Sequence, residues 1–219
     1  LVTYLDGKKE RVGVINEDET WVYPLRSLGM PYVDMQEVVE KMSRAEKELI
    51  GIYNRKEPDE IHGAIPVKDV ELLAPIPRPK QDIICLGINY MEHAVESARY
   101  KQEAFGGERP YAVYFSKRVN EELVDSLDYE CELAVIIGKD AKNVPEDEAA
   151  DYIFGYTIIN DVSARNVQTR HKQWYFGKSL DGFTPMGPCI TTADSIAFPP
   201  RLTIQSKVNG ELRQNSSTE

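Results

Sequence analysis

The sequence has little of what directs a chain to a membrane or to nucleic acid. No stretch reaches the roughly 18 consecutive apolar residues that a membrane-spanning helix needs, and the N-terminus carries no signal-peptide pattern. Lysine and arginine number 26 against 36 aspartates and glutamates, so the formal net charge is −10. This excess of negative charge argues against nucleic acid or an anionic membrane as a partner. We therefore expect a cytoplasmic protein that binds neither.

Cysteine and histidine are also scarce, with three of each. Cys85, Cys131 and Cys189 lie far apart, and two of them lie in apolar runs, which is typical of reduced thiols rather than of a disulfide framework. None of the cysteines has the spacing of zinc ligands, so the sequence does not predict a zinc centre. An acidic protein that binds an anionic metabolite needs a local positive charge at the binding site, such as a metal ion other than zinc.

The composition is otherwise that of a globular protein, and its patterns predict an α+β fold that is mostly β. In residues 1–71 we predict a small α+β domain. It has a hairpin in "VTYLDGKKERVGVI", a strand in "ETWVYPL" and helical spacing over residues 33–53, with Asp34 as the cap. The proline-rich connector "LLAPIPRPKQ" marks a domain boundary. Residues 72–219 predict a second domain of short strands separated by Gly, Pro and Asn turns.

The two ends of the sequence are unusual for a whole gene product. The chain opens on Leu1 rather than on methionine, and it stops after the polar stretch "VNGELRQNSSTE" with no closing element behind it. We therefore expect the 219 residues to be part of a longer protein.

Two glutamates interrupt a stretch that otherwise predicts a core strand, "LDYECELAVIIGK", residues 127–139. Side chains alternate along a strand, so Glu130 and Glu132 share one face, with carboxylates roughly 7 Å apart. Buried together without a counter-charge, they would repel each other and one would become neutral. Either this face is half-exposed and paired with lysines, or a cation lies between the two glutamates.

A third carboxylate favours the cation. Residues 152–160 predict a strand that ends at Asp161, before the polar start of a helix. A side chain at such a position is carried by a rigid scaffold, where functional groups commonly lie. Together with Glu130 and Glu132, Asp161 makes an all-oxygen set that suits Mg²⁺ or Mn²⁺.

Four further side chains are candidates for chemistry. His93 and Glu96 are three residues apart at the start of a predicted helix, so they share a face, as in pairs that activate water and in many surface pairs without function. Residues 171–188 predict a rigid, glycine-punctuated loop on which Lys178 either neutralises an anionic ligand or is an ordinary surface lysine. Gln168 is predicted to lie on the same helix as Arg165, one turn from Asp161. From there it could reach a ligand bound at the metal.

Five stretches, taken in order, resemble the fumarylacetoacetate hydrolase family. They are "LGINYMEHAVES", "LDYECELAVIIGK", "FGYTIINDVSARNVQ", "FGKSLDGFTPMGP" and "VNGELRQ". The resemblance covers residues 72–219 and is strongest to bacterial enzymes that act on short 2-oxo acids, whose small N-terminal domain is similar in size to residues 1–71. It implies a mixed β-roll or β-sandwich in the C-terminal domain.

The resemblance also implies roles for the candidate residues. Mg²⁺ or Mn²⁺ would be held by Glu130, Glu132 and Asp161, and this cation would be the missing counter-charge. The family's H-x-x-E pair, which orients or deprotonates the attacking water, matches His93 and Glu96. The remaining matches are Lys178, expected to stabilise developing negative charge, and Gln168, expected to contact the substrate.

Three departures from the family pattern stand out. Asn166 takes the place of an aspartate, and the segment before Leu123 is shorter than usual. The family's Thr-Pro-x-Gly-Val-Gly loop, which closes the substrate site, does not follow "VNGELRQ" here.

The function that the resemblance implies is metal-dependent hydrolysis or decarboxylation of a short 2-oxo acid, such as an acylpyruvate or oxaloacetate, through an enolate. Isomerisation or decarboxylation of 2-hydroxyhepta-2,4-diene-1,7-dioate is an alternative that does not need the His93–Glu96 pair. A metal-binding scaffold without turnover is a second alternative. The resemblance further implies a homodimer.

Overall fold

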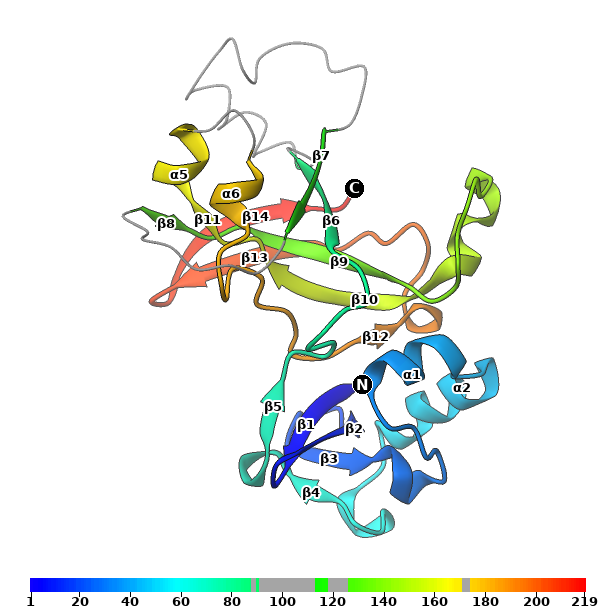
Figure 1. The fold of residues 1–219 in the computed structure, drawn as a ribbon. Coiled ribbons are helices and arrows are strands. Elements are labelled where there is room, and N and C mark those ends of the chain that lie inside the picture. Colours follow the sequence, from blue (N-terminus) through cyan, green and yellow to red (C-terminus); the bar gives the residue numbers. More distant parts are fainter. Residues whose placement is uncertain (88–89, 91–112, 118–125, 171–173) are drawn as a thin grey trace. The chain divides into compact units, whose positions relative to one another are not determined.

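The computed structural model describes residues 1–87, 90, 113–117, 126–170 and 174–219 (Figure 1). These residues form two compact units. The first unit comprises Leu1–Pro79, Leu133–Ile158 and Met186–Phe198, and the second unit comprises Lys80–Glu132, Ile159–Pro185 and Pro199–Glu219. Strands dominate the described elements, which confirms the α+β, mostly β fold class. The domain boundary expected between residues 71 and 72 stays a prediction.

The first unit contains a five-stranded antiparallel sheet in the order β4-β3-β2-β1-β5. Its strands are β1 (Val2–Asp6), β2 (Lys9–Ile15), β3 (Trp21–Pro24), β4 (Ile65–Pro66) and β5 (Glu71–Leu73). The predicted hairpin is confirmed as β1 and β2, drawn in blue in Figure 1, with Asp6 opposite Lys9. Gly7 in the turn has a φ of 63°, a conformation that glycine adopts at no steric cost.

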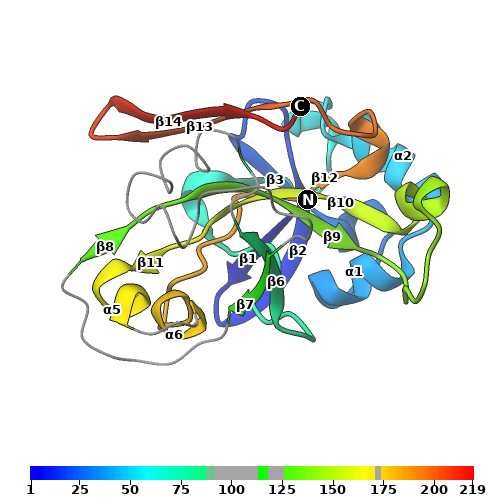
Figure 2. The same cartoon turned by 90° about the horizontal axis from the view of Figure 1, so that it is seen from above.

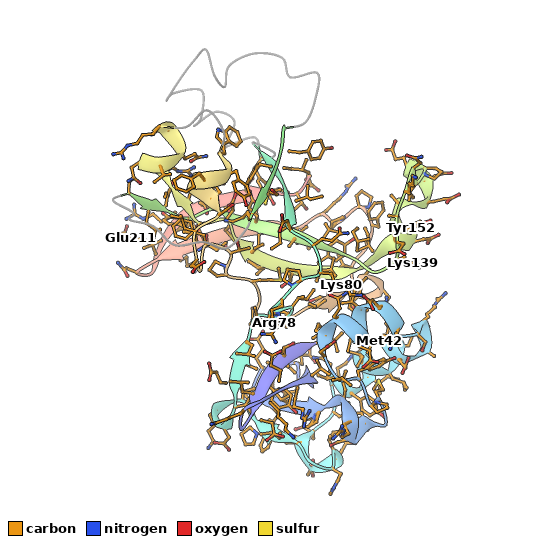
Figure 3. All side chains as sticks on the ribbon, viewed as in Figure 1. Met42, Arg78, Lys80, Lys139, Tyr152 and Glu211 are labelled. Carbon is orange, nitrogen blue, oxygen red and sulfur yellow. The ribbon has the colours of Figure 1, made fainter. Side chains whose placement is uncertain are left out.

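The helical stretch of residues 33–53 is two helices, not the one continuous pattern expected from the sequence. They are α1 (Met35–Lys41) and α2 (Arg44–Tyr53). Asp34 caps α1 as predicted, since its Oδ1 accepts a hydrogen bond from the Glu37 N–H at 2.8 Å. The break falls at Met42 (Figure 3), where the backbone is extended, because Ser43 and Glu46 form a reciprocal capping box that starts a new helix.

The core of the first unit combines the N-terminal elements with later segments of the chain. Its fully buried apolar side chains include Val14, Tyr23, Leu25, Met35, Val38, Phe154 and Ile190. Phe154 belongs to a three-stranded sheet in the order β12-β10-β9, made of β9 (Cys131–Ile137), β10 (Ile153–Asn160) and β12 (Thr191–Thr192). Where the chain passes between β9 and β10, the Lys139 ammonium lies 5.6 Å from the ring centroid of Tyr152 (Figure 3).

The described residues of the second unit include three antiparallel strand pairs and two short helices. The pairs are β6 (Ile83–Gly87) with β7 (Val113–Lys117), β8 (Leu127–Asp128) with β11 (Ser163–Ala164), and β13 (Thr203–Val208) with β14 (Glu211–Ser217). The helices are α5 (Arg165–Arg170) and α6 (Tyr175–Lys178). Strands β13 and β14 run side by side as a hairpin in both views (Figure 1 and Figure 2). Gln214 of β14 accepts a hydrogen bond from the Cys131 N–H at 2.9 Å, which ties this hairpin to the start of β9.

Five 3₁₀ helices complete the described elements. They are η1 (Leu25–Leu28), η2 (Pro58–Glu60), η3 (Val67–Asp69), η4 (Glu146–Tyr152) and η5 (Ala193–Ser195). Cys85, Cys131 and Cys189 are free thiols. Among the described helices, none has the length and apolar character that a membrane crossing requires.

Candidate metal centre

Three carboxylates of the second unit converge. Glu130, Glu132 and Asp161, here called the carboxylate triad, each place one oxygen within 4.8 Å of the other two. The single strand expected over residues 127–139 is instead two, β8 and β9, and Glu130 lies in the irregular segment between them. This break lets the glutamate carboxylates approach each other more closely than strand alternation alone allows.

Backbone hydrogen bonds join the two segments that carry the triad. The Asp161 N–H donates to the Glu130 carbonyl at 2.8 Å, and the Glu130 N–H donates to the Asn160 side-chain oxygen at 3.1 Å. Ser163 of β11 adds a hydroxyl that contacts Glu130 Oε1 at 3.3 Å and the Asp161 carbonyl at 3.1 Å. Asp161 therefore follows the end of β10, as predicted, and is held beside Glu130 by the main chain itself.

The triad is largely removed from water. Glu130 is 7% exposed and Asp161 0%, while Glu132 is partly buried. Carboxylates buried this close together need positive charge nearby, because the unpaired arrangement is strongly unfavourable.

Two buried lysines supply part of that charge through Asp161. The Lys178 ammonium lies 2.6 Å from Asp161 Oδ2 and 3.0 Å from Glu130 Oε1. Lys117 of β7 binds the other oxygen, Asp161 Oδ1, and also donates to the Phe183 and Val162 carbonyls. Lys178 was expected on a loop, but the structure places it at the end of helix α6, buried and turned to the triad.

An arginine completes the cationic side of the site. Arg165, at the start of α5, pairs with Glu130 Oε1 at 2.7 Å and with Asp128 Oδ2 at 2.8 Å. Its Nη1 donates to Gln168 Oε1 at 2.8 Å, so Gln168 is connected to the triad through Arg165. The substrate contact expected of Gln168 stays a prediction. His93 and Glu96 lie outside the described residues, and their roles stay predictions too.

Sequence reasoning missed Lys117 and did not connect Arg165 to the triad. Lys117 ends an apolar strand, and the only local signal is that a lysine closes the run "YAVYFSK". Its partner Asp161 is 44 residues away along the chain, and no local pattern links the two.

Glu132 differs from the other two members of the triad. Among the described residues, none donates a hydrogen bond to its carboxylate. Burial, together with the negative charges of Asp161 and Glu130, raises the pKa of Glu132 to about 8. The charges of Lys178 and Lys117 offset this rise only in part, so the triad retains a carboxylate whose charge the two lysines do not fully compensate.

The residues present fit a hard divalent cation. The ligand atoms are all carboxylate oxygens, which is the set that Mg²⁺ and Mn²⁺ prefer and Zn²⁺ in structural sites does not. Counted as ionised, the cluster holds four carboxylates (the triad and Asp128) against the cations of Lys117, Arg165 and Lys178. Among the described residues this leaves one net negative charge, and Glu132 is the carboxylate that none of them contacts through a hydrogen bond or ion pair.

A glycine allows Lys178 to reach the triad. Gly177 lies in α6 against the backbone of α5, and a Cβ added there would meet Gln168 N at 2.6 Å and Gln168 Cα at 2.7 Å. Such distances are well inside van der Waals contact, and backbone atoms cannot rotate away. Close packing of α5 on α6 therefore requires glycine next to Lys178.

Comparisons with known proteins place the chain in a family. Residues 82–219 match the family model described as fumarylacetoacetate (FAA) hydrolase, C-terminal. This match covers more than half of the chain, which is therefore a member of the fumarylacetoacetate hydrolase family.

Individual relatives carry several activities. Oxaloacetate tautomerase YisK of Bacillus subtilis is 45% identical over 163 residues, a match that covers 69% of this chain and 52% of that protein. The chain thus spans about half the length of this relative. A fumarylacetoacetate hydrolase from the psychrophile Exiguobacterium antarcticum has a TM-score of 0.72 at 33% identity, covering 99% of this chain and 74% of that one. A 2-hydroxyhepta-2,4-diene-1,7-dioate isomerase from Mycobacterium marinum has a TM-score of 0.56 at 34% identity, covering 72% and 59%.

Substitution of Gly177 tests how Lys178 is positioned. We expect Gly177→Ala to lower the free energy of unfolding by about 1–3 kcal/mol, because the added methyl group forces α6 away from α5. Mn²⁺ affinity should change as well, since Lys178 moves with α6. Gly51→Ala in α2 is the matched control, because a Cβ there would meet only the Arg55 side chain, at an ordinary contact distance of 4.0 Å, and it should raise stability by about 0.5–1 kcal/mol. Urea unfolding that shows no loss for Gly177→Ala would contradict this packing.

The raised pKa of Glu132 predicts how metal binding depends on pH. A ligand carboxylate must be ionised, so metal has to displace the proton that Glu132 carries below about pH 8. We expect Mn²⁺ affinity to rise from about pH 6 to about pH 8 and then to level off. Calorimetry in buffers of different ionisation enthalpy should detect proton release at neutral pH. Glu132→Gln should bind Mn²⁺ weakly and without this proton release, and a wild-type affinity independent of pH would refute the assignment.

Proposed function

We propose that the protein is a divalent-metal-dependent enzyme that acts on a short 2-oxo acid of the oxaloacetate or acylpyruvate type through its enol or enolate. The observation that carries the proposal is the carboxylate triad, buried together with two lysine ammonium groups in one cluster. Family membership supports it, because two of the relatives named above carry such a compound in their printed names. One names oxaloacetate, a 2-oxo acid, and the other names 2-hydroxyhepta-2,4-diene-1,7-dioate, the enol form of one.

Charge balance supports an anionic substrate. The cluster has one net negative charge with all groups ionised, so a bound divalent cation would give it one net positive charge. A site of that charge attracts a dicarboxylate such as oxaloacetate, despite the overall charge of −10.

The residues of the site have three different roles in the proposed reaction: metal binding, stabilisation of negative charge and contact with the substrate. Glu130, Glu132 and Asp161 would hold Mg²⁺ or Mn²⁺, which when bound supplies Lewis acidity toward carboxylate and 2-oxo oxygens. Lys178 presents an ammonium group from a nearly dry position, where its charge stabilises a developing enolate more strongly than it would in water. Arg165 holds the Gln168 amide oxygen, which leaves the Gln168 amide nitrogen to donate to the substrate.

Keto–enol interconversion of oxaloacetate is the reaction that the described residues support best. It requires stabilisation of an enolate, which a metal held by the triad would supply together with the Lys178 ammonium, and it is the activity in the printed name of the 45% identical relative. Hydrolysis of an acylpyruvate needs an activated water in addition, and the His93–Glu96 pair predicted from the sequence would supply it. Hydrolysis or decarboxylation is therefore the second candidate, and isomerisation of a hydroxy-dienedioate the third, favoured by the Mycobacterium marinum structure. The cytoplasmic location and the homodimer stay predictions.

Turnover measurements separate these reactions. With Mn²⁺, we expect faster loss of the ultraviolet absorbance of enol-oxaloacetate, with EDTA abolishing the effect and added Mn²⁺ restoring it. Pyruvate formation reports decarboxylation, and acetate plus pyruvate from acetylpyruvate reports hydrolysis. His93→Ala should abolish hydrolysis and leave tautomerisation intact, whereas Glu132→Gln should abolish both. Bound Mn²⁺ without turnover of either substrate or of 2-hydroxyhepta-2,4-diene-1,7-dioate would instead support a non-catalytic scaffold.

A further inference from the structure

We propose that the two lysines bound to Asp161 have opposite roles toward the metal: Lys178 is an exchangeable internal cation, and Lys117 is the fixed positioning residue of Asp161. The inference rests on the proposed metal site and concerns how this chain holds that site with and without metal. Its basis is that one buried carboxylate is bound through Oδ2 by Lys178 and through Oδ1 by Lys117.

Lys178 lies where it must interfere with a metal ion. Its ammonium bridges Asp161 Oδ2 and Glu130 Oε1, at 2.6 and 3.0 Å, and both oxygens belong to residues of the triad. A divalent ion bound by the same carboxylates at about 2.1 Å and this ammonium would repel each other across a short distance in a dry site. Lys178 therefore neutralises two members of the triad in the absence of metal and has to give way when metal binds.

The surroundings of Lys178 provide another partner for its charge. The Phe115 ring centroid lies 5.0 Å from Nζ, within cation–π range. Phe115 is itself fixed by an edge-on contact with Trp174, with ring centroids 5.8 Å apart. The ammonium can thus leave the carboxylates without losing all of its electrostatic partners, and in that position it is available to a bound substrate.

Lys117 has no such freedom. It is 3% exposed, and its ammonium contacts Asp161 Oδ1 and the carbonyls of Val162 and Phe183, so each of its three protons has an acceptor. Its backbone is fixed in β7, opposite Ile83 of β6. Movement of Lys117 would leave the buried Phe183 carbonyl, the partly buried Val162 carbonyl and one buried carboxylate oxygen without this donor, which is costly.

These roles predict effects of opposite sign from the same chemical change. If both lysines acted only as positive charges, removing either would strengthen binding of a divalent cation. A partner that orients a ligating carboxylate behaves differently, because its loss typically weakens metal binding by about 10–100-fold. The sign of the change at Lys117 therefore separates positioning from plain charge.

The test compares Lys178→Met and Lys117→Met by calorimetric titration with Mn²⁺ and by thermal unfolding in EDTA. We expect Lys178→Met to bind Mn²⁺ at least about tenfold more tightly than wild type. Its melting temperature in EDTA should be lower than that of wild type, and its stabilisation by Mn²⁺ larger. Lys117→Met should bind Mn²⁺ about 10–100-fold more weakly.

Each outcome is decisive. Unchanged or weaker binding in Lys178→Met would overturn the role of an exchangeable cation, and tighter or unchanged binding in Lys117→Met would overturn the positioning role. If Lys117→Met does not fold, Lys117→Arg replaces it: the charge is kept, the planar guanidinium misplaces Asp161, and binding at least about tenfold weaker is expected, whereas wild-type affinity would overturn the role. Failure of the wild-type protein to bind Mn²⁺ would refute the proposed metal site itself, which distinguishes the two failures.

Discussion

The buried carboxylate of Asp161, bound by one lysine on each oxygen, is the interaction on which the candidate site depends. A charge that is 0% exposed persists only with close partners, and here they come from β7 and α6. The Asp161 main chain also donates to Glu130, so the same residue sets the position of a second member of the triad. Strand β7, helix α6 and the segments flanking β10 and β9 thus meet at a single side chain.

Two local features of the backbone allow these charged side chains to come together. The break between β8 and β9 frees Glu130 from strand alternation, and the absence of a side chain at Gly177 lets α6 lie against α5. These are small features, yet each one decides where a charged group lies. In the resulting triad, no described residue neutralises Glu132 by a direct bond. Burial of this carboxylate beside Asp161 and Glu130 raises the pKa of Glu132, and the same arrangement fits a divalent cation.

The acidic half of the site was predictable from sequence, and the basic half was not. Alternation along the expected strand predicted Glu130 and Glu132 on one face, and local pattern predicted Asp161 at a strand end. The structure confirms that the three gather, although Glu130 lies just before β9 rather than within it. The contacts of Lys117 depend on pairing between β6 and β7 and on tertiary packing, which no local pattern encodes. The break at Met42 did have a local signal in the Ser43–Glu46 capping box, but helical periodicity continued across it and concealed it.

The central claim is that a divalent cation binds at the carboxylate triad, and anomalous diffraction from crystals soaked in Mn²⁺ tests it most directly. The account predicts an anomalous peak in contact with carboxylate oxygens of Glu130, Glu132 and Asp161, with the Lys178 ammonium moved away from Asp161 Oδ2. Lys117 should remain on Asp161 Oδ1. A peak elsewhere, or none with Lys178 still bridging Glu130 and Asp161, would contradict it.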